Sequence, residues 1–284
     1  MTIAGVGLIG GSLALAARRA GLVGEVVGLG RGAANLETAR QRGIVDRFSH
    51  DPLEAARDAD LLILAVPVGA LAATARACAP ALRAGAIVSD VGSVKAMVVR
   101  EVEAVLPAGL SFVGAHPIAG TERSGAAAAD ADLFRGSRCI LTPSARSMPS
   151  ATAKIRALWE GLGMQVESMD AQRHDAILAW VSHLPHAIAF SFIHSLAAVD
   201  RDYGTYGGPS FRSLTRVVAS SPEMWRDIFL ANAEQIDAAL GHLSSGLDRL
   251  QHAIVARDPE ALLALLQEAQ AAYGAWRPPG GDGA

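Results

Sequence analysis

A glycine-rich turn near the N-terminus, GVGLIGG, most restricts how this 284-residue chain can fold. Gly5, Gly7 and Gly10 follow the pattern G-x-G-x-x-G, directly after the apolar run TIA and before the helix-like stretch GGSLALAARRAG. In that context the first glycine permits a tight turn, the second lets backbone approach a pyrophosphate, and the third allows close helix–strand packing. The turn predicts a Rossmann-type, dinucleotide-binding domain rather than a ligand-free turn, with Leu8 and Ile9 also in the binding loop.

Further apolar runs predict the rest of a sheet. They are rich in valine, isoleucine and leucine with little polar alternation, which is typical of strands buried on both faces. Helix-length connections separate them, so βαβ units and a largely parallel sheet are expected. The runs are EVVGLGR, LLILAVP, AIVSDVG, SFVGAHP, RCILTP and MQVESM.

The pattern changes after Met169, where apolar residues recur at helical spacing and no strand is evident. Pro185 should kink or break the first of these helices, and Ser221 before Pro222 is a credible helix start. We therefore predict an α/β dinucleotide-binding domain over residues 1–169 and an all-α domain over residues 170–284. Helices that are apolar on several faces favour a homodimer through this second domain.

Composition excludes several functions. A net charge of −3 provides no basic field for nucleic acid or an anionic membrane. The richest apolar run, Leu61–Ala73, is too short to span a bilayer and contains Pro67, and no secretory leader is evident. Cys78 and Cys139 lie far apart in the chain. From the charge and the short apolar run we expect no membrane or nucleic-acid partner. Because two distant cysteines do not indicate a disulfide framework, we expect a cytoplasmic location.

The end of the second predicted strand bears on which dinucleotide binds. NAD-selective sites usually carry an acid there to hold the ribose 2′-hydroxyl. This strand ends GLGRG, and Arg31 stands in the place of the acid. A guanidinium can hold a 2′-phosphate, so NADP is favoured, with NAD as the alternative if Arg31 is only a surface residue. Val66 and Pro67, after the next central strand, are also expected at the cofactor.

Polar residues gather where the predicted strands end, and parallel sheets bind ligands at that edge. SDVGSVK supplies Ser93, and GAHPIAG supplies His116. A lone histidine is more often structural, but this one lies in the crevice expected for nicotinamide, near a hydroxyl. We predict that His116 transfers a proton to or from a small-molecule substrate, with an ordinary pKa near neutrality.

The helical half adds a second set of polar residues. His183 and His186 could share a helix face, and Arg212 and Arg216 could form a carboxylate clamp on one face of another helix. The non-functional alternatives are that the two histidines are hydrogen-bonded core residues and that the two arginines lie on a solvent-exposed helix face. No third ligand or HExxH pattern accompanies the histidines, so no metal site is expected.

Six motifs occur in order over almost the whole chain: GVGLIGGSL, DVGSVK, GAHPIAGTERSG, VSHLPH, FRSLTR and SPEMWRDIFLAN. In order and spacing they resemble those of the prephenate and arogenate dehydrogenases. The resemblance implies NAD(P)-dependent oxidative decarboxylation in tyrosine biosynthesis, by a Rossmann domain followed by a helical dimerisation domain.

The resemblance also implies roles for single residues. His116 corresponds to the catalytic histidine, Ser93 to the hydroxyl that hydrogen-bonds to it and to substrate, and Arg216 to the group that binds the ring carboxylate. His183 and His186 would line the site.

The same resemblance implies roles for two further residues. Glu122 would contact the substrate side chain or gate the pocket, and Trp225 would help close it. Ser213 departs from the family pattern, because many relatives have aspartate directly after the position of Arg212, so any salt bridge made there is missing here.

Two other functions remain open from the sequence. Another β-hydroxyacid-type dehydrogenase or an imine reductase would explain the glycine turn and the helices, but not HPIAG with SHLPH and the two arginines. A non-catalytic NADP-binding sensor would keep the glycine turn without need of Ser93 and His116. Cofactor binding without turnover would favour the sensor.

Overall fold

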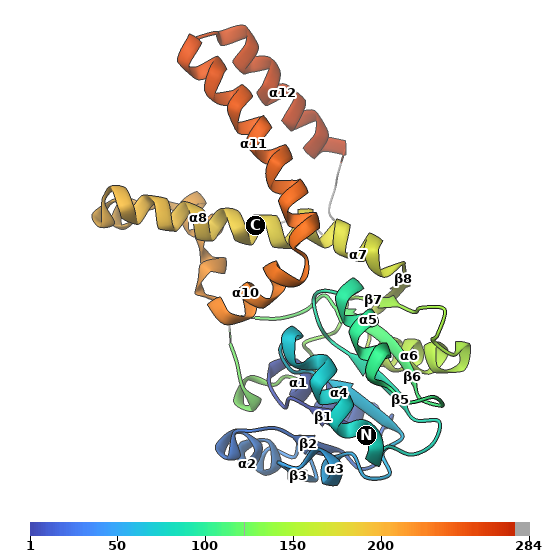
Figure 1. Ribbon diagram of the computed structural model, residues 1–284. Coiled ribbons are helices and arrows are strands. Elements are labelled where there is room, and N and C mark those ends of the chain that lie inside the picture. Colours follow the sequence, from blue (N-terminus) through green and yellow to red (C-terminus); the bar gives the residue numbers. More distant parts are fainter. Residues whose placement is uncertain (122, 276–284) are drawn as a thin grey trace. The chain divides into compact units, whose positions relative to one another are not determined.

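The computed structural model describes residues 1–121 and 123–275 of the chain (Figure 1). Contacts divide the chain into two compact units, Met1–Gln235 and Ile236–Ala284, which are described separately below. The first unit contains the whole sheet and every described residue of the candidate site.

A single eight-stranded sheet forms the centre of the first unit, in the order β3-β2-β1-β4-β5-β6-β7-β8. Every neighbouring pair is parallel except β6 and β7. The predicted strands are confirmed, but β3 was missed because its sequence, RFS, is short and largely polar. The strands are β1 (Thr2–Ala4), β2 (Val27–Leu29), β3 (Arg47–Ser49), β4 (Leu61–Leu64), β5 (Ile87–Asp90), β6 (Ser111–Pro117), β7 (Arg138–Thr142) and β8 (Gln165–Ser168).

Helices cover both faces of this sheet, as the apolar strands require. In β4, Ile63 faces one apolar core, whereas Leu62 and Leu64 face the other, because successive side chains of a strand point to opposite faces. Burying each such side chain contributes roughly 1.5–3 kcal/mol. The first core includes α1 (Leu8–Arg19), α2 (Ala33–Gln41) and α6 (Pro149–Gly161), and the second includes α3 (Pro52–Ala55), α4 (Leu71–Cys78) and α5 (Ala96–Val105).

The direction of strand succession reverses at β1. The chain runs outward from β1 to β2 and β3, then returns to β4 on the other side of β1. In such a sheet, ligands bind beyond the carboxyl ends of the strands at this reversal. The glycine turn after β1 and the Ala65–Pro67 loop after β4 lie there.

The helical part of the first unit begins directly after β8. The predicted kink or break at Pro185 takes the form of a π-helical turn within a continuous helical stretch. The turn spans Ala179–His183 between α7 and α8, and Pro185 lies in the first turn of α8. Proline has no N–H for the helical bond, so the preceding turn takes wider geometry. The main helices here are α7 (Ala171–Leu178), α8 (Leu184–Val199), α9 (Pro209–Thr215) and α10 (Pro222–Ala231).

The start of α10 also follows from its sequence. Ser221 caps the helix and its Oγ accepts the N–H of Met224 at 3.2 Å, while Pro222 occupies the first turn. Proline is suited to that position because its missing N–H would have no helical partner there.

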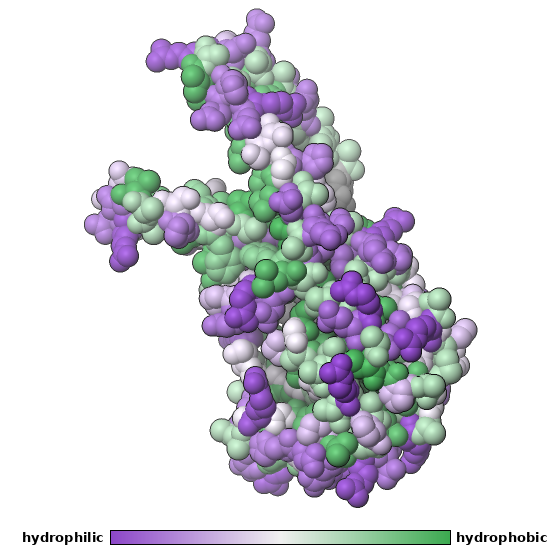
Figure 2. Space-filling model, in the orientation of Figure 1, coloured by the Kyte–Doolittle hydropathy of each residue, from purple (hydrophilic) through white to green (hydrophobic). Residues whose placement is uncertain are grey.

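Long apolar helices dominate the C-terminal part of the chain. The second unit contains most of α11 (Ala233–Ala256) and α12 (Pro259–Ala275), and α12 has no buried residue. Exposed large apolar side chains include Leu247, Val255, Leu263 and Tyr273, and Figure 2 shows apolar surface on this region. In the described part of the chain one helical stretch, Ala171–Val199, is long and apolar enough to cross a membrane, by length and composition only. Core helices of other proteins meet the same criterion.

Candidate active site

The glycine turn has the steric requirements of a dinucleotide loop. Gly5 has a φ of +97°, and a Cβ there would lie 2.3 Å from the carbonyl oxygen of Ala65. A Cβ on Gly10 would lie 2.3 Å from the oxygen of Gly5, whereas nothing lies within 4 Å of the corresponding point on Gly7. The turn thus packs tightly against β4 and is open at Gly7, where a pyrophosphate would approach.

The start of α1 fits an anionic group. Gly7 is its N-cap residue and provides no side-chain hydrogen bond. The first N–H groups of the helix, from Leu8 and Ile9 onward, therefore have no side-chain cap, and the helix end carries partial positive charge. The residues present are suited to the phosphates of a nicotinamide dinucleotide.

The remaining predicted cofactor residues lie on the same sheet edge. Arg31 is exposed two residues after the end of β2, and Val66 and Pro67 follow β4. A Cβ on Gly5 would lie 2.9 Å from the N atom of Val66, so the loop after β4 directly adjoins the glycine turn.

His116 lies near the end of β6 and is partly buried. Its Nδ1 is 2.9 Å from Nε2 of His174, and Nδ1 of His174 is 2.8 Å from Oδ1 of Asp175. Asp175 also accepts hydrogen bonds from the backbone N–H groups of Lys95 and Ala96, each at 2.8 Å. His116 is thus connected through two side chains to the N-terminus of α5.

A buried ion pair holds the backbone next to His116. Lys95 and Asp90 are both fully buried, and Nζ of Lys95 bonds to Oδ2 of Asp90. Nζ also donates to the carbonyl oxygen of Ala115 at 2.9 Å, and Oδ1 of Asp90 accepts the N–H of Ala115 at 3.1 Å. Both polar groups of the residue preceding His116 are therefore fixed, which limits how the imidazole can move.

The electrostatic surroundings keep His116 neutral. Burial lowers its pKa well below the ordinary value of 6.5, and His174, Lys95 and His183 lower the pKa further. The expectation of an ordinary pKa was therefore wrong, because a strand end facing a helix layer is less hydrated than the sequence indicates. A neutral imidazole at physiological pH can accept a proton.

His183 forms the next part of the site. It is fully buried, and its Nδ1 lies 3.0 Å from Nδ2 of Asn232, which also donates to the carbonyl oxygen of Asp175 at 2.9 Å. The amide donates, so Nδ1 of His183 accepts and Nε2 carries the hydrogen. Nε2 has no hydrogen bond within the described residues, although the backbone of Ser93 lies near enough to raise the pKa slightly. Burial dominates and lowers the pKa of His183 to about 4.

Trp225 joins His183 to a third histidine. It stacks on His186 with ring centroids 3.6 Å apart and lies edge-on to His183 at 6.2 Å. Burial lowers the pKa of His186, and the nearby charge of Arg216 lowers it further. The structure thus brings His183, His186, Trp225 and Arg216 together, although they come from three separate segments.

For other predicted site residues, the structure does not show the arrangement expected from the sequence. The described part of the chain has no hydrogen bond between Ser93 and His116, whose Nδ1 instead faces His174. The two arginines do not share one regular helix, because α9 ends at Thr215 and Arg216 begins a 3₁₀ turn. Arg212 is exposed and donates to the carbonyl oxygen of Gly207 at 2.7 Å. Glu122 lies outside the described residues.

Sequence reasoning assigned no role to the side chains that support the site. Asp90 and Lys95 belong to the run SDVGSVK, and His174 and Asp175 stand in the same polar stretch, RHDAILAWVSHLPH, as His183 and His186. A charged pair in an otherwise apolar strand–turn–helix connection was the available signal for the first two. Nothing in the sequence indicated that α7 would pack against α5 and β7, which brings the second pair to His116.

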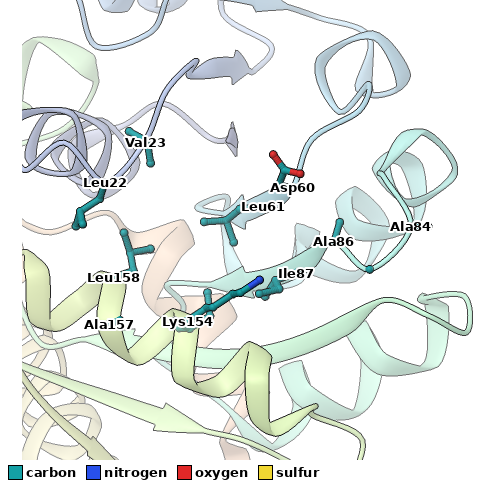
Figure 3. A pocket seen from close by; sticks show the side chains of 12 residues that line it. Leu22, Val23, Asp60, Leu61, Ala84, Ala86, Ile87, Lys154, Ala157 and Leu158 are labelled. Atoms are coloured by element: carbon teal, nitrogen blue, oxygen red, sulfur yellow. The ribbon is translucent and has the colours of Figure 1, made fainter.

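A separate pocket of about 360 Å³ lies at the amino ends of the central strands, opposite the strand ends that carry the candidate site (Figure 3). Leu61 and Ile87, which begin β4 and β5, line it together with Leu158. Asp60 and Lys154 are its charged residues, and Asp60 already pairs with Arg83 at 2.8 Å. Because this pocket lies at the amino ends of the strands, it is not the site formed by His116 and the glycine turn.

Comparison with known families identifies the architecture. Residues 13–168 match the nucleotide-binding domain of prephenate dehydrogenase, and residues 170–268 match the dimerization domain of prephenate dehydrogenase. The chain belongs to the prephenate dehydrogenase family. Its Rossmann-type domain and helical C-terminal domain confirm the predicted fold class.

Relatives and solved structures of this family align over nearly the whole chain. Cyclohexadienyl dehydrogenase of Zymomonas mobilis is 38% identical over 96% of this chain and 94% of its own length. Prephenate dehydrogenase of Bacillus subtilis is 30% identical over 94% of this chain and 73% of its own. The Aquifex aeolicus prephenate dehydrogenase, solved with hydroxyphenyl propionate and NAD⁺, has a TM-score of 0.90 at 34% identity, covering 96% of both chains.

Proposed function

We propose that this enzyme catalyses the NAD(P)-dependent oxidative decarboxylation of prephenate, arogenate or both, in tyrosine biosynthesis. The observation that carries the proposal is the buried, neutral imidazole of His116, which lies at the end of β6 with its Nδ1 2.9 Å from Nε2 of His174, in a chain of this family. The products are 4-hydroxyphenylpyruvate from prephenate and tyrosine from arogenate, with carbon dioxide.

The cofactor would be held by the glycine turn and the first turn of α1, with Val66 and Pro67 alongside. When bound, a nicotinamide dinucleotide supplies an acceptor for the hydride that leaves C4 of the substrate. The residues of the chain position the substrate and manage the hydroxyl proton.

His116 accepts the proton of the substrate 4-hydroxyl as C4 becomes a carbonyl. The electrons of the C–CO₂ bond then enter the ring, carbon dioxide leaves and the ring becomes aromatic, so that the step is effectively irreversible. A base of this kind contributes about a hundredfold or more to the rate. Ser93 is proposed to contact the same hydroxyl, and interactions that strengthen as the carbonyl forms contribute to the rate more than ground-state contacts do.

Arg216 is proposed to bind the ring carboxylate, with His183, His186 and Trp225 as the remaining walls of the substrate site. The support is their mutual proximity: His186 stacks on Trp225, and the charge of Arg216 reaches His186. A guanidinium can bind a carboxylate through two parallel hydrogen bonds. Arg212 is retained as a more distant contact.

Substrate and cofactor preference are finer proposals. Glu122 would pair with the ammonium of arogenate and repel the second carboxylate of prephenate, and activity on both substrates is the cautious expectation. Arg31 would favour NADP through the 2′-phosphate. The Aquifex relative was solved with NAD⁺, which keeps NAD as the alternative.

We further propose a cytoplasmic homodimer with functional domains of residues 1–169 and 170–284. The exposed apolar side chains of α11 and α12, and the match of residues 170–268 to a dimerization domain, support the dimer. Sedimentation at several protein concentrations would test it, and a monomer at micromolar concentration would contradict it.

Steady-state kinetics with each substrate and each cofactor tests the function. Reduced cofactor should form in equal amount to released carbon dioxide with prephenate, arogenate or both. Tight cofactor binding without turnover of either would instead support a sensor, and equal efficiency on both substrates would remove any selective role of Glu122.

A further inference from the structure

We propose that His174 and Asp175 are positioning residues that determine which ring nitrogen of His116 acts as the base. The inference deepens the proposed function and rests on it, because it concerns the proton that His116 accepts. Neither residue was assigned a role by the sequence or the family resemblance.

Asp175 can only accept hydrogen bonds in its position. It is 2% exposed, and its two oxygens face the backbone N–H groups of Lys95 and Ala96 at the start of α5. Backbone N–H groups are obligatory donors, and an ionised carboxylate has no hydrogen to donate. The start of α5 also carries partial positive charge, which stabilises the ionised carboxylate there.

This acceptor determines the tautomer of His174. Its Nδ1 lies 2.8 Å from Oδ1 of Asp175, so Nδ1 carries the hydrogen. Burial lowers the pKa of His174, and the ring is therefore neutral at physiological pH. A neutral ring protonated on Nδ1 has its lone pair on Nε2.

The same logic extends to His116. Its Nδ1 lies 2.9 Å from Nε2 of His174, which now accepts, so Nδ1 of His116 carries the hydrogen and Nε2 carries the lone pair. Nε2 is then the atom that receives the proton: the substrate O–H bond breaks, an Nε2–H bond forms, and the O–H electron pair stays on oxygen. The resulting cation keeps its Nδ1–H bond to His174 without a second transfer.

The opposite tautomer would disable the base. With hydrogen on Nε2, His116 could donate to the substrate hydroxyl but could not accept its proton. Fixing the tautomer through a neighbouring acceptor is a general device for a catalytic imidazole. A purely structural alternative is that the chain of bonds only fastens α7 to α5 and β6, and the experiments below separate the two.

Nitrogen NMR on the wild-type protein reads the tautomer directly. Long-range ¹H–¹⁵N correlation of ¹⁵N-histidine-labelled enzyme at pH 7.5, assigned with His116→Asn, should show neutral His116 protonated on Nδ1 and bare on Nε2. His174 should show the same pattern. A neutral His116 protonated on Nε2 would overturn the proposal, whether or not the enzyme turns over.

Paired variants test the consequence for catalysis. His174→Phe fills the space without an acceptor and should lower kcat about tenfold or more, with KM changed less than about twofold. His174→Gln, whose amide oxygen can accept the Nδ1 hydrogen, should retain most of kcat and the Nδ1–H signal of His116. His252→Gln, at an exposed histidine of α11, is the matched control.

The outcomes separate the proposals. Equal loss of kcat in both His174 variants, with a lowered Tm and an unchanged His116 tautomer, would show a structural role and overturn the inference. Unchanged kcat in His174→Phe would overturn it as well. If the wild-type enzyme turns over neither substrate, the proposed function fails, while the NMR result still decides the tautomer.

Discussion

At the residue scale, the surroundings of His116 keep its imidazole neutral, and therefore available as a base, but they also make its protonated state costly. Burial and the nearby Lys95 lower its pKa, so the neutral base persists into acidic solution. The same surroundings would destabilise the imidazolium that forms if His116 accepts the substrate proton as proposed. The hydrogen bond from its Nδ1 to His174 is the contact in the described site that can stabilise this charge.

Replacing the proposed base, His116, should remove most of the activity. We expect His116→Asn to lower kcat by about a hundredfold or more. In the wild-type enzyme the acidic limb of kcat/KM should titrate below pH 6.5, because the folded-state pKa of His116 is below that value. A variant with nearly unchanged kcat across the pH range would eliminate the assignment.

Arg216 should act mainly on substrate binding. Arg216→Ala removes a charged donor from the proposed carboxylate site, and we expect KM to rise about tenfold or more with a smaller change in kcat. Arg83→Ala, at the opposite edge of the sheet and paired with Asp60, is the control. Unchanged substrate saturation would show that the ring carboxylate binds elsewhere.

Arg31 should determine the cofactor preference. Arg31→Asp removes the cation proposed for the 2′-phosphate and adds a carboxylate that can hold a 2′-hydroxyl instead. The ratio of kcat/KM for NADP to that for NAD should fall by about tenfold or more. An unchanged ratio in this variant would mean that Arg31 is a surface residue without a part in selection.

At the element scale, the connection from β5 to α5 supports the end of β6. Asp90 is the last residue of β5, and Lys95 immediately precedes α5. Together they form hydrogen bonds with the backbone N–H and carbonyl groups of Ala115. A buried ion pair of this kind is weak evidence for net stability, but breaking it leaves an uncompensated charge. Its clear effect here is to hold the strand end that carries His116.

This ion pair can be tested by a double-mutant cycle. Lys95→Met should destabilise the fold by about 3–5 kcal/mol, because Asp90 is then buried without its partner. Adding Asp90→Asn should recover part of the stability, since the amide oxygen can still accept the N–H of Ala115 or Gly92. Additive losses in urea unfolding would show that the two side chains act independently.

At the scale of the whole molecule, four histidines of the first unit have lowered pKa values, chiefly through burial. The unfolded chain binds protons to these groups near pH 6.5, whereas the folded unit does not. Stability is therefore retained above that pH and lost as the pH falls through the window below it.

His183 makes the acid sensitivity measurable. Its pKa is about 4 in the folded protein against 6.5 ordinarily, so it should cost about 3 kcal/mol of stability over that window. Urea unfolding at pH 7.5 and 5.5 should show lower stability at the lower pH. His183→Gln should weaken this dependence and His252→Gln should not; equal dependence in both would contradict the assignment.

The sequence alone determined the dinucleotide-binding architecture, because its signals are local. Each of these signals depends on a few neighbouring residues: the glycine turn, the apolar runs of β4 and β5, the helix irregularity before Pro185 and the cap at Ser221. Residue types at strand ends also placed His116 at the carboxyl end of a strand, where the structure has it, and its role in proton transfer stays a prediction. The short polar strand β3 was missed because three residues carry too little pattern.

Only the tertiary structure decided how His116 is held and charged. Its contact with His174 joins positions 58 residues apart, and that of Asp175 with Lys95 joins positions 80 apart. Such contacts depend on how α7 packs against α5 and β7, which no local pattern specifies. Burial, and with it the pKa of each histidine, follows from the same packing, because the cost of a charge depends on everything that surrounds it.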